Sequence, residues 1–225
     1  MIQITKLSKT FGNNQVLSNI SLTIPRGKIV GIVGANGAGK TTLFKCIAGL
    51  LPHEGNIVAD WTPLKEHLGL LLTDPFFFSR MTGKEYLRML CDARKVPVPD
   101  LDRNNLFNLP LSRYASTYST GMKKKLAITG ILLQQNDCFI LDEPFNGLDI
   151  QSNIMVVDLL HHLRERGKTV LVSSHIFSTL KDTCDEIHVL SEGELVKSVK
   201  ADAYADLEDE LKKDLAVKGL AEMDF

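Results

Sequence analysis

The feature that most constrains this chain is a glycine-rich stretch that matches the pattern G-x-x-x-x-G-K-[ST]: Gly34-Ala35-Asn36-Gly37-Ala38-Gly39-Lys40-Thr41. It follows an almost continuously apolar run at 29–33, typical of a buried strand, and precedes apolar residues at helical spacing. Glycines let successive backbone N–H groups point at phosphate oxygens, and the positive end of the helix adds to the same anion site. Lys40 supplies a full charge to the β- and γ-phosphates, and the Thr41 hydroxyl can ligate Mg²⁺. The stretch therefore predicts an α/β protein that binds a nucleoside triphosphate.

Two adjacent carboxylates, Asp142 and Glu143, follow a second apolar run at 138–141. The carboxyl ends of parallel strands meet at one edge of a sheet, so we expect this pair beside the phosphate loop. Asp142 would then contact Mg²⁺, directly or through a water, and Glu143 would accept a proton from a water aligned on the γ-phosphate. Adjacent acids alone usually mark a solvated strand end, and it is their combination with the loop that favours a hydrolytic site.

Strand patterns alternate with helical patterns along most of the chain, which predicts an α/β core with a parallel sheet. The expected strands lie at 20–24, 29–33, 56–59, 67–72, 138–141, 169–173 and 187–190. Between about 80 and 135 we expect only helices and loops, beginning with a capping box at Thr82 and Glu85. Residues 1–200 are assigned to this core with its helical insertion. Residues 201–225 are assigned to a C-terminal amphipathic helix or tail, which either packs on the core or binds a partner.

The composition excludes several classes of protein. With 26 basic and 27 acidic side chains the net charge is -1, so we expect no nucleic-acid partner. The 4 cysteines are widely spaced and form no Cys-x-x-Cys pair, which leaves a zinc site or a disulfide framework without support. No apolar run approaches the roughly 18–20 residues of a membrane span, and the first residues do not resemble a signal peptide. We expect a soluble, cytosolic chain.

Further short segments accompany the loop and the acidic pair in a fixed order: Lys9-Thr10-Phe11-Gly12, Asn36-Gly37-Ala38-Gly39-Lys40-Thr41-Thr42, Asp142-Glu143-Pro144, Gly147-Leu148-Asp149 and Ser173-Ser174-His175. Over residues 2–200 this order resembles the nucleotide-binding subunits of ABC transporters. The resemblance implies a P-loop NTPase core with a mixed sheet, an N-terminal antiparallel β subdomain and an inserted α-helical subdomain. It also implies that Phe11 stacks on adenine, that Thr42 belongs to the phosphate loop, that Asp149 lies in a loop at a dimer interface, and that His175 senses the γ-phosphate.

The segment Tyr118-Ser119-Thr120-Gly121-Met122 is the best counterpart of the family's signature. Ser119 can cap a helix whose free N–H groups hold an anion, and the resemblance places that anion on the opposite subunit. ATP would then join two subunits into a homo- or heterodimer. The leucine, first glycine and final glutamine of the family pattern are Tyr118, Thr120 and Met122 here, so we expect an altered affinity for the closed dimer. The lysines at 123–125 are expected on a solvated helix face, with a docking contact as the alternative.

A larger difference from the family pattern lies just after the strand expected at 67–72. The family carries a glutamine there that touches Mg²⁺ and connects the site to the membrane subunit, whereas this chain has Thr73, followed by Asp74. A threonine is too short for the same reach, although its hydroxyl or the Asp74 carboxylate could act through a water. Three phenylalanines at 76–78 are expected either in the core or, in part, at a groove that receives a segment of a membrane subunit.

The resemblance implies an ATP hydrolase with bound ATP and Mg²⁺ that powers transport through a separate transmembrane permease. The segment Gly121-Met122-Lys123 resembles exporter-type members more than importers. Such a chain would be cytoplasmic and held on the inner face of the membrane by its partner. A GTP-binding switch is disfavoured because the chain has no Asn-Lys-x-Asp segment. A non-transport ATPase of the same family, or a nucleotide-binding regulator with little turnover, remain the alternatives.

Overall fold

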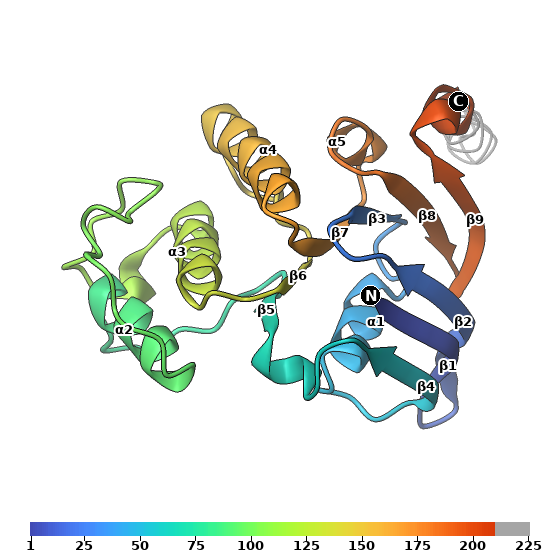
Figure 1. The fold of residues 1–225 in the computed structure, drawn as a ribbon, viewed down its shortest axis with the longest axis horizontal. Coiled ribbons are helices and arrows are strands. Elements are labelled where there is room, and N and C mark those ends of the chain that lie inside the picture. Colours follow the sequence, from blue (N-terminus) through green and yellow to red (C-terminus); the bar gives the residue numbers. More distant parts are fainter. Residues whose placement is uncertain (210–225) are drawn as a thin grey trace, which may run out of the picture.

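The computed structural model describes residues 1–209, which form two β-sheets flanked by helices (Figure 1). The strands are β1 (Ile2–Phe11), β2 (Asn14–Ile24), β3 (Ile29–Val33), β4 (Glu54–Ala59), β5 (Leu68–Leu71), β6 (Cys138–Leu141), β7 (Thr169–Ser174), β8 (Glu186–Ser191) and β9 (Glu194–Lys200). The helices are α1 (Lys40–Ile47), α2 (Gly83–Ala93), α3 (Thr120–Leu133), α4 (Ile150–Glu165) and α5 (Phe177–Lys181). Within 1–209, none of the helices has both the length and the apolar character that a bilayer crossing requires.

The larger sheet has the strand order β5-β6-β7-β3-β8-β9 and is parallel except for the last pair. Strands β3, β6 and β7 are buried along their whole length because helices or the second sheet cover both faces. The predicted bounds of β3 and β6 agree with the structure residue for residue. All the parallel strands end at the same edge, and that edge carries the site described below.

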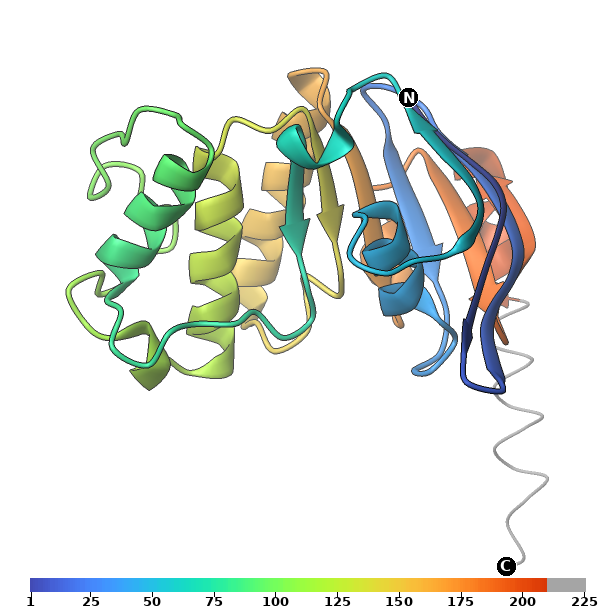
Figure 2. The ribbon, with the colours of Figure 1, turned by 90° about the horizontal axis from the view of Figure 1, so that it is seen from below.

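The smaller sheet, with the order β2-β1-β4, is antiparallel, as the resemblance implies. Helix α1 lies between the two sheets (Figure 2). Its Leu43 and Phe44 are fully buried, together with Ile4 and Leu22 of the small sheet and Ile140 of the large one. This shared core holds the beginning of α1 fixed against the end of β3.

Helices α2 and α3 form a separate helical arm at one side of the molecule (Figure 1). As predicted, the stretch from Gly83 to Gln135 contains no strand. The capping box is present: the Thr82 hydroxyl accepts the Glu85 N–H, and the Glu85 carboxylate accepts the Thr82 N–H. The arm has its own core, which consists of Leu87, Leu101, Leu109, Leu111, Ala115, Tyr118 and Leu126.

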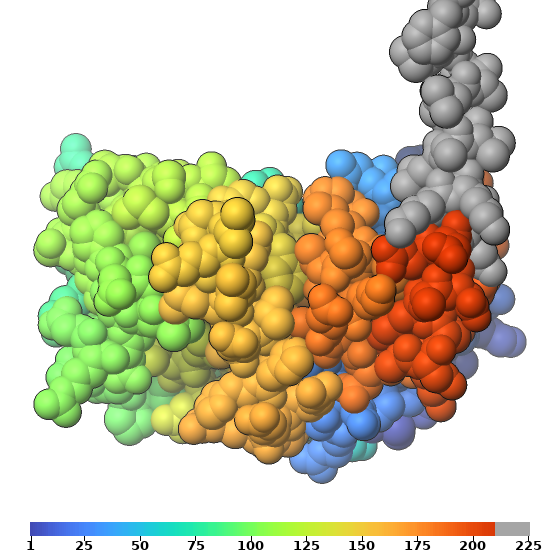
Figure 3. Space-filling model, turned by 90° about the horizontal axis from the view of Figure 1, so that it is seen from above, coloured from blue at the N-terminus to red at the C-terminus, as the bar shows by residue number. Residues whose placement is uncertain are grey.

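The face opposite α1 is covered by α4, which lies beside the arm, and then by α5 and the beginning of the C-terminal segment, which lies farthest from the arm (Figure 3). Tyr204 and Leu207 are buried there, so the described part of the segment assigned to 201–225 packs on the core. The remainder of that segment, 210–225, lies outside the described residues.

Candidate active site

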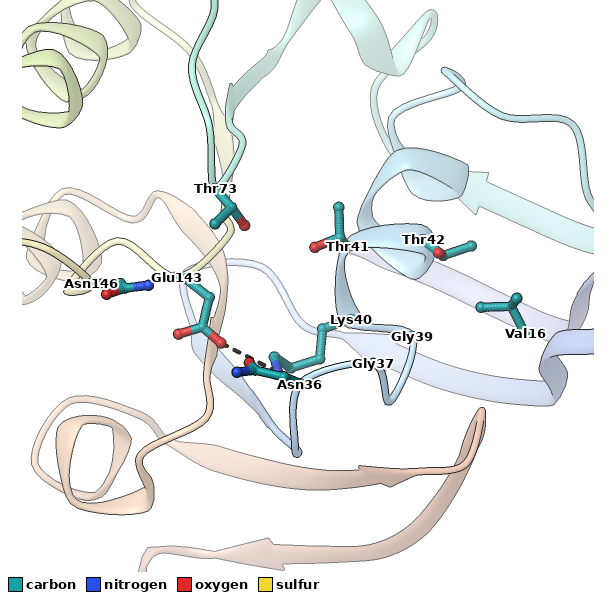
Figure 4. A pocket seen from close by; sticks show the side chains of 10 residues that line it. All are labelled: Val16, Asn36, Gly37, Gly39, Lys40, Thr41, Thr42, Thr73, Glu143 and Asn146. Carbon is teal, nitrogen blue, oxygen red and sulfur yellow. Dashed lines mark ion pairs between the residues drawn. The ribbon is translucent and has the colours of Figure 1, made fainter. Parts of the chain in front are cut away.

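A cavity of about 260 Å³ opens at the carboxyl edge of the large sheet (Figure 4). Its walls come from the β3–α1 loop, from the ends of β5 and β6, and from β2. The residues that line it are Val16, Asn36, Gly37, Gly39, Lys40, Thr41, Thr42, Thr73, Glu143 and Asn146. The structure therefore brings the phosphate loop and the acidic pair together, although about 100 residues separate them in the sequence.

The phosphate loop has the backbone that its glycines predict. Gly37 and Gly39 have φ angles of 85° and 107°, in the left-handed region that favours glycine. At Gly34 a Cβ atom would lie 2.3 Å from the backbone oxygen of Leu190, so a side chain cannot fit there. The loop ends at Lys40, the first residue of α1, whose positive end faces the cavity.

The Lys40 ammonium folds back over its own loop. It donates to the backbone oxygens of Gly34 at 2.6 Å and Ala35 at 3.1 Å, and lies 3.2 Å from Glu143 Oε1. Figure 4 shows this ion pair across the cavity. Lys40 is 6% exposed, so the charge sits where a phosphate group would enter.

Asp142 is fully buried, and its carboxylate accepts hydrogen bonds from three hydroxyl groups. Its Oδ2 accepts from Thr41 Oγ1 at 2.5 Å and from Thr73 Oγ1 at 2.7 Å, while its Oδ1 accepts from Ser173 Oγ at 2.7 Å. A carboxylate and two hydroxyl oxygens converge at the cavity wall, and hard oxygen donors of this kind are the ligands that Mg²⁺ prefers. The residues therefore fit a magnesium ion. Thr73 donates directly to Asp142, and its expected action on Mg²⁺ through a water stays a prediction.

Glu143 is held on both sides of its carboxylate. His175 Nδ1 lies 2.8 Å from Oε2, and Lys40 Nζ lies near Oε1, which has no aligned hydrogen bond among the described residues. The Glu143 backbone has φ 49°, unusual for a residue other than glycine, and strain of this kind concentrates at functional positions. Glu143 and His175 were both singled out in the sequence, and the structure places them in contact.

The other predicted site residues lie away from the cavity of their own chain. Phe11 ends β1 and is 46% exposed, with Lys9 Nζ 4.7 Å from its ring centroid. Ser119 caps α3 and accepts the N–H of Met122, and neither it nor Thr120 is covered. Asp149 caps α4 and forms an ion pair with Lys125 at 2.8 Å, which together with the Ser152 hydrogen bonds holds the pKa of Asp149 below its ordinary value.

Packing explains how two departures from the family signature, Tyr118 and Thr120, are accommodated. Tyr118 is 4% exposed, belongs to the core of the arm and donates its hydroxyl to the Pro110 carbonyl at 2.8 Å, so a larger side chain is accommodated where the family has leucine. A Cβ atom at Gly121 would lie 2.7 Å from the backbone oxygen of Gly147, whereas Thr120 projects into the open. Only the second glycine of the pair is therefore required by the fold.

Sequence reasoning missed three residues of this region: Val16 and Asn146, which line the cavity, and Lys124. The prediction of a solvated face at 123–125 is wrong for Lys124, which is 2% exposed. Its spacing to the buried Ile128 and Ile131 is that of one helix face, and this signal could have revealed it. Asn146 lies between two motifs that were recognised separately, and nothing in the sequence marked Val16.

Comparison with known proteins agrees with this geometry. A family model described as ABC transporter matches residues 17–146. The bacitracin transport ATP-binding protein BcrA of Enterococcus faecalis is 34% identical over 212 residues, covering 88% of this chain and 69% of BcrA. The ABC transporter ATP-binding protein NatA of Bacillus subtilis (strain 168) is 32% identical over 216 residues, covering 87% of this chain and 88% of NatA. A solved ATP-binding subunit of an ABC transporter is 26% identical, with a TM-score of 0.85 and coverage of 96% of this chain and 99% of that one. This chain belongs to the ABC transporter family and has the fold of its ATP-binding subunits.

Proposed function

We propose that this chain hydrolyses ATP in a Mg²⁺-dependent reaction and thereby powers transport through a separate transmembrane permease. The observation that carries the proposal is the meeting of Lys40 and Glu143 at one cavity that Thr41 and Thr73 also line. Behind these residues, His175 contacts Glu143, and Asp142 accepts hydrogen bonds from both threonines. A phosphate cradle, a carboxylate positioned as a base and a set of metal-compatible oxygens are the parts that phosphoryl transfer to water needs.

Each residue has a defined task in this reaction. The amides of the loop and the beginning of α1 bind the phosphates, and Lys40 leaves the Gly34 and Ala35 carbonyls to neutralise phosphate charge. Asp142, Thr41 and Thr73 would hold Mg²⁺, which when bound neutralises further charge on the phosphate oxygens. Glu143 accepts the proton of the attacking water, and His175 orients the Glu143 carboxylate through its contact with Oε2.

The working form is proposed to be a dimer, of two copies or with a related subunit. The signature residues Ser119, Thr120, Gly121 and Met122 do not line the cavity of their own chain, yet Ser119 and Thr120 are uncovered. Apolar side chains are exposed close to the motifs, with Ile150 next to Asp149 82% exposed and Ile176 next to His175 48% exposed. A partner surface would cover them, and its signature helix would complete the cavity, with Phe11 stacking on the adenine of the bound nucleotide.

The membrane partner is proposed to contact the segment after β5. Phe76 is 75% and Phe78 is 51% exposed, and their rings pack edge to face at 5.2 Å, while Phe77 packs on Tyr86 of the arm. Exposed aromatic side chains so close to Thr73 suit docking of an apolar permease segment. The chain would then work at the inner face of the membrane, and what is transported is set by the permease.

The test is a comparison of wild type with Glu143→Gln and Lys40→Ala in a phosphate-release assay. Removing the base should lower turnover by a factor on the order of 10²–10⁴ while ATP still binds. Lys40→Ala should abolish nucleotide retention because the loop loses its only full charge for the phosphates. Equal rates in wild type and Glu143→Gln would remove the hydrolytic assignment.

A further inference from the structure

Lys124 is a lysine buried behind the active site, and the reaction outlined above gives it no task. Its side chain is 2% exposed, and its Nζ donates to the backbone oxygen of Glu143 at 2.6 Å. Burial lowers the pKa of the Lys124 ammonium, whereas the carboxylates of Glu143, Asp142 and Asp74 act in the opposite direction. Taking an ammonium out of water is costly unless dipoles and opposite charges replace the solvent. These groups supply that compensation, and all of them belong to the site or adjoin it.

The contact made by Lys124 fixes an unusual piece of backbone. Glu143 has φ 49°, and both of its peptide groups are bound by side chains: its N–H donates to Ser173 Oγ at 3.0 Å, and its carbonyl accepts from Lys124. The same carbonyl accepts the N–H of Asn146 at 3.2 Å. A left-handed conformation at a residue with a long side chain persists only where its surroundings hold it. Lys124 is the part of those surroundings that comes from the helical arm.

The first two turns of α3 hold the segment 143–149 at three points. Gly121 lies directly against the Gly147 carbonyl, Lys124 binds the Glu143 carbonyl, and Lys125 pairs with Asp149 at 2.8 Å. The helix begins immediately after Ser119. A displacement at the beginning of α3 therefore reaches the backbone of Glu143 through packed and hydrogen-bonded atoms, with no intervening loop.

The two buried lysines near Glu143 differ in whether they have to move when a nucleotide binds. Lys40 contacts Glu143 Oε1 and two loop carbonyls, and it has to leave them when phosphates enter. Lys124 binds a main-chain oxygen on the far side of Glu143 and lies outside the lining of the cavity, so a nucleotide does not compete for it. After Lys40 has moved, Lys124 remains as the fixed cation beside Glu143.

We propose that Lys124 is a positioning residue for Glu143, and that it ties the beginning of the signature helix to the base of the same chain's own cavity. The proposal rests on the proposed hydrolysis at Glu143 and on the binding of the partner's nucleotide at Ser119. Binding at the beginning of α3 would thereby set the orientation of Glu143 in the subunit that provides the helix, so that each nucleotide site prepares the other.

Lys124→Met tests this because methionine matches the buried stem and removes the donor, and Lys123→Met is the matched control one position earlier. We expect Lys124→Met to lower kcat for ATP at least tenfold with KM changed less than threefold, and Lys123→Met to retain wild-type values. Lys124→Arg, which restores a donor, should recover part of the lost kcat. A kcat for Lys124→Met within twofold of wild type, or no recovery with arginine alongside a general loss of stability, would overturn the proposal.

Hydrogen exchange supplies a second measurement that does not depend on turnover. Lys124→Met should speed amide exchange in 142–149 relative to Lys123→Met, while exchange in α2 stays unchanged; unchanged exchange in 142–149 contradicts the proposal. Should Lys124→Met fail to fold, Lys124→Gln is measured by the same two methods. An inactive wild type would refute the proposed function, whereas an active wild type with an equally active Lys124→Met refutes only the role of Lys124.

Discussion

Thr73, at the position where the family resemblance expects a glutamine, contacts the buried carboxylate of Asp142. Its hydroxyl donates directly to Asp142 Oδ2, the oxygen that also accepts from Thr41. The two threonines come from different elements, one after β5 and one from α1, and they fix the same carboxylate oxygen from two sides. At this position the chain keeps a link between the segment after β5 and the proposed metal site, although the reach of the side chain is shorter.

Replacing Thr73 should therefore change the dependence on Mg²⁺ more than the maximal rate. Thr73→Val keeps the shape and removes the donor, and a hydrogen bond to a charged group contributes about 1.5–3 kcal/mol. We expect the Mg²⁺ concentration for half-maximal ATPase activity to rise on the order of tenfold, while Thr73→Ser stays near wild type. The measurement is a magnesium titration at saturating ATP. Identical magnesium titrations for Thr73→Val and wild type would mean that Thr73 does not contribute to the metal site.

At the scale of elements, the sequence predicts best the strands that are buried on both faces. The runs of β3 and β6 are continuously apolar, so both bounds were found. Strand β1 was missed because register shifts interrupt its alternation and Lys6 adopts φ 52°. Strand β9 was missed because it is an edge strand in which Val199 is the single buried residue. An edge strand needs apolar residues on one face at most, and its pattern resembles that of a loop.

The same limit applies to the beginning of α3. The sequence identifies Ser119 as a cap because capping depends on local backbone geometry. It cannot tell that Lys124 binds the Glu143 carbonyl or that Gly121, and not Thr120, needs to be glycine, because both facts depend on the segment 143–149 packing against the helix. The motif residues could thus be predicted from local chemistry. The residues that hold them in place, such as Lys124 and Gly121, could be identified only from the three-dimensional structure.

Gly121→Ala measures how tightly α3 packs on that segment. In an ordinary helix, alanine stabilises by about 1 kcal/mol relative to glycine. Here the added Cβ would lie 2.7 Å from the Gly147 carbonyl, and overpacking of this kind costs about 1–3 kcal/mol. We expect a net decrease in the free energy of unfolding, measured with urea, of about 1 kcal/mol. Thr120→Ala on the exposed neighbour should stay within about 0.5 kcal/mol. A stabilised Gly121→Ala protein would show that the contact is loose.

At the scale of the whole molecule, the proposed dimer would use two separate parts of each chain. The cavity contains the phosphate loop, Glu143 and Thr73, and the signature residues 119–122 lie outside its lining. In a symmetric dimer the same surface of each copy faces the other, so each cavity can receive the partner's signature helix and give its own in return. The exposed Ile150 and Ile176 lie beside motif residues, which places an apolar surface where this pairing would bury it.

This arrangement predicts complementation between two inactive variants. Lys40→Ala disables the phosphate loop and leaves the signature intact, whereas Ser119→Arg blocks the signature and leaves the loop intact. In a dimer that contains one copy of each, the intact loop faces the intact signature, so one of its two sites is complete. Half of the dimers are of this mixed kind after equal mixing, so at most about a quarter of wild-type ATPase activity should return, and less than that where the empty second site leaves Glu143 of the complete site unprepared. Each variant alone should stay inactive. A mixture of Lys40→Ala with the double variant Glu143→Gln/Ser119→Arg should also stay inactive, because the restored site then lacks its base. If equal mixing of the two single variants restores nothing at any protein concentration, the signature helix does not act on a second copy of this chain.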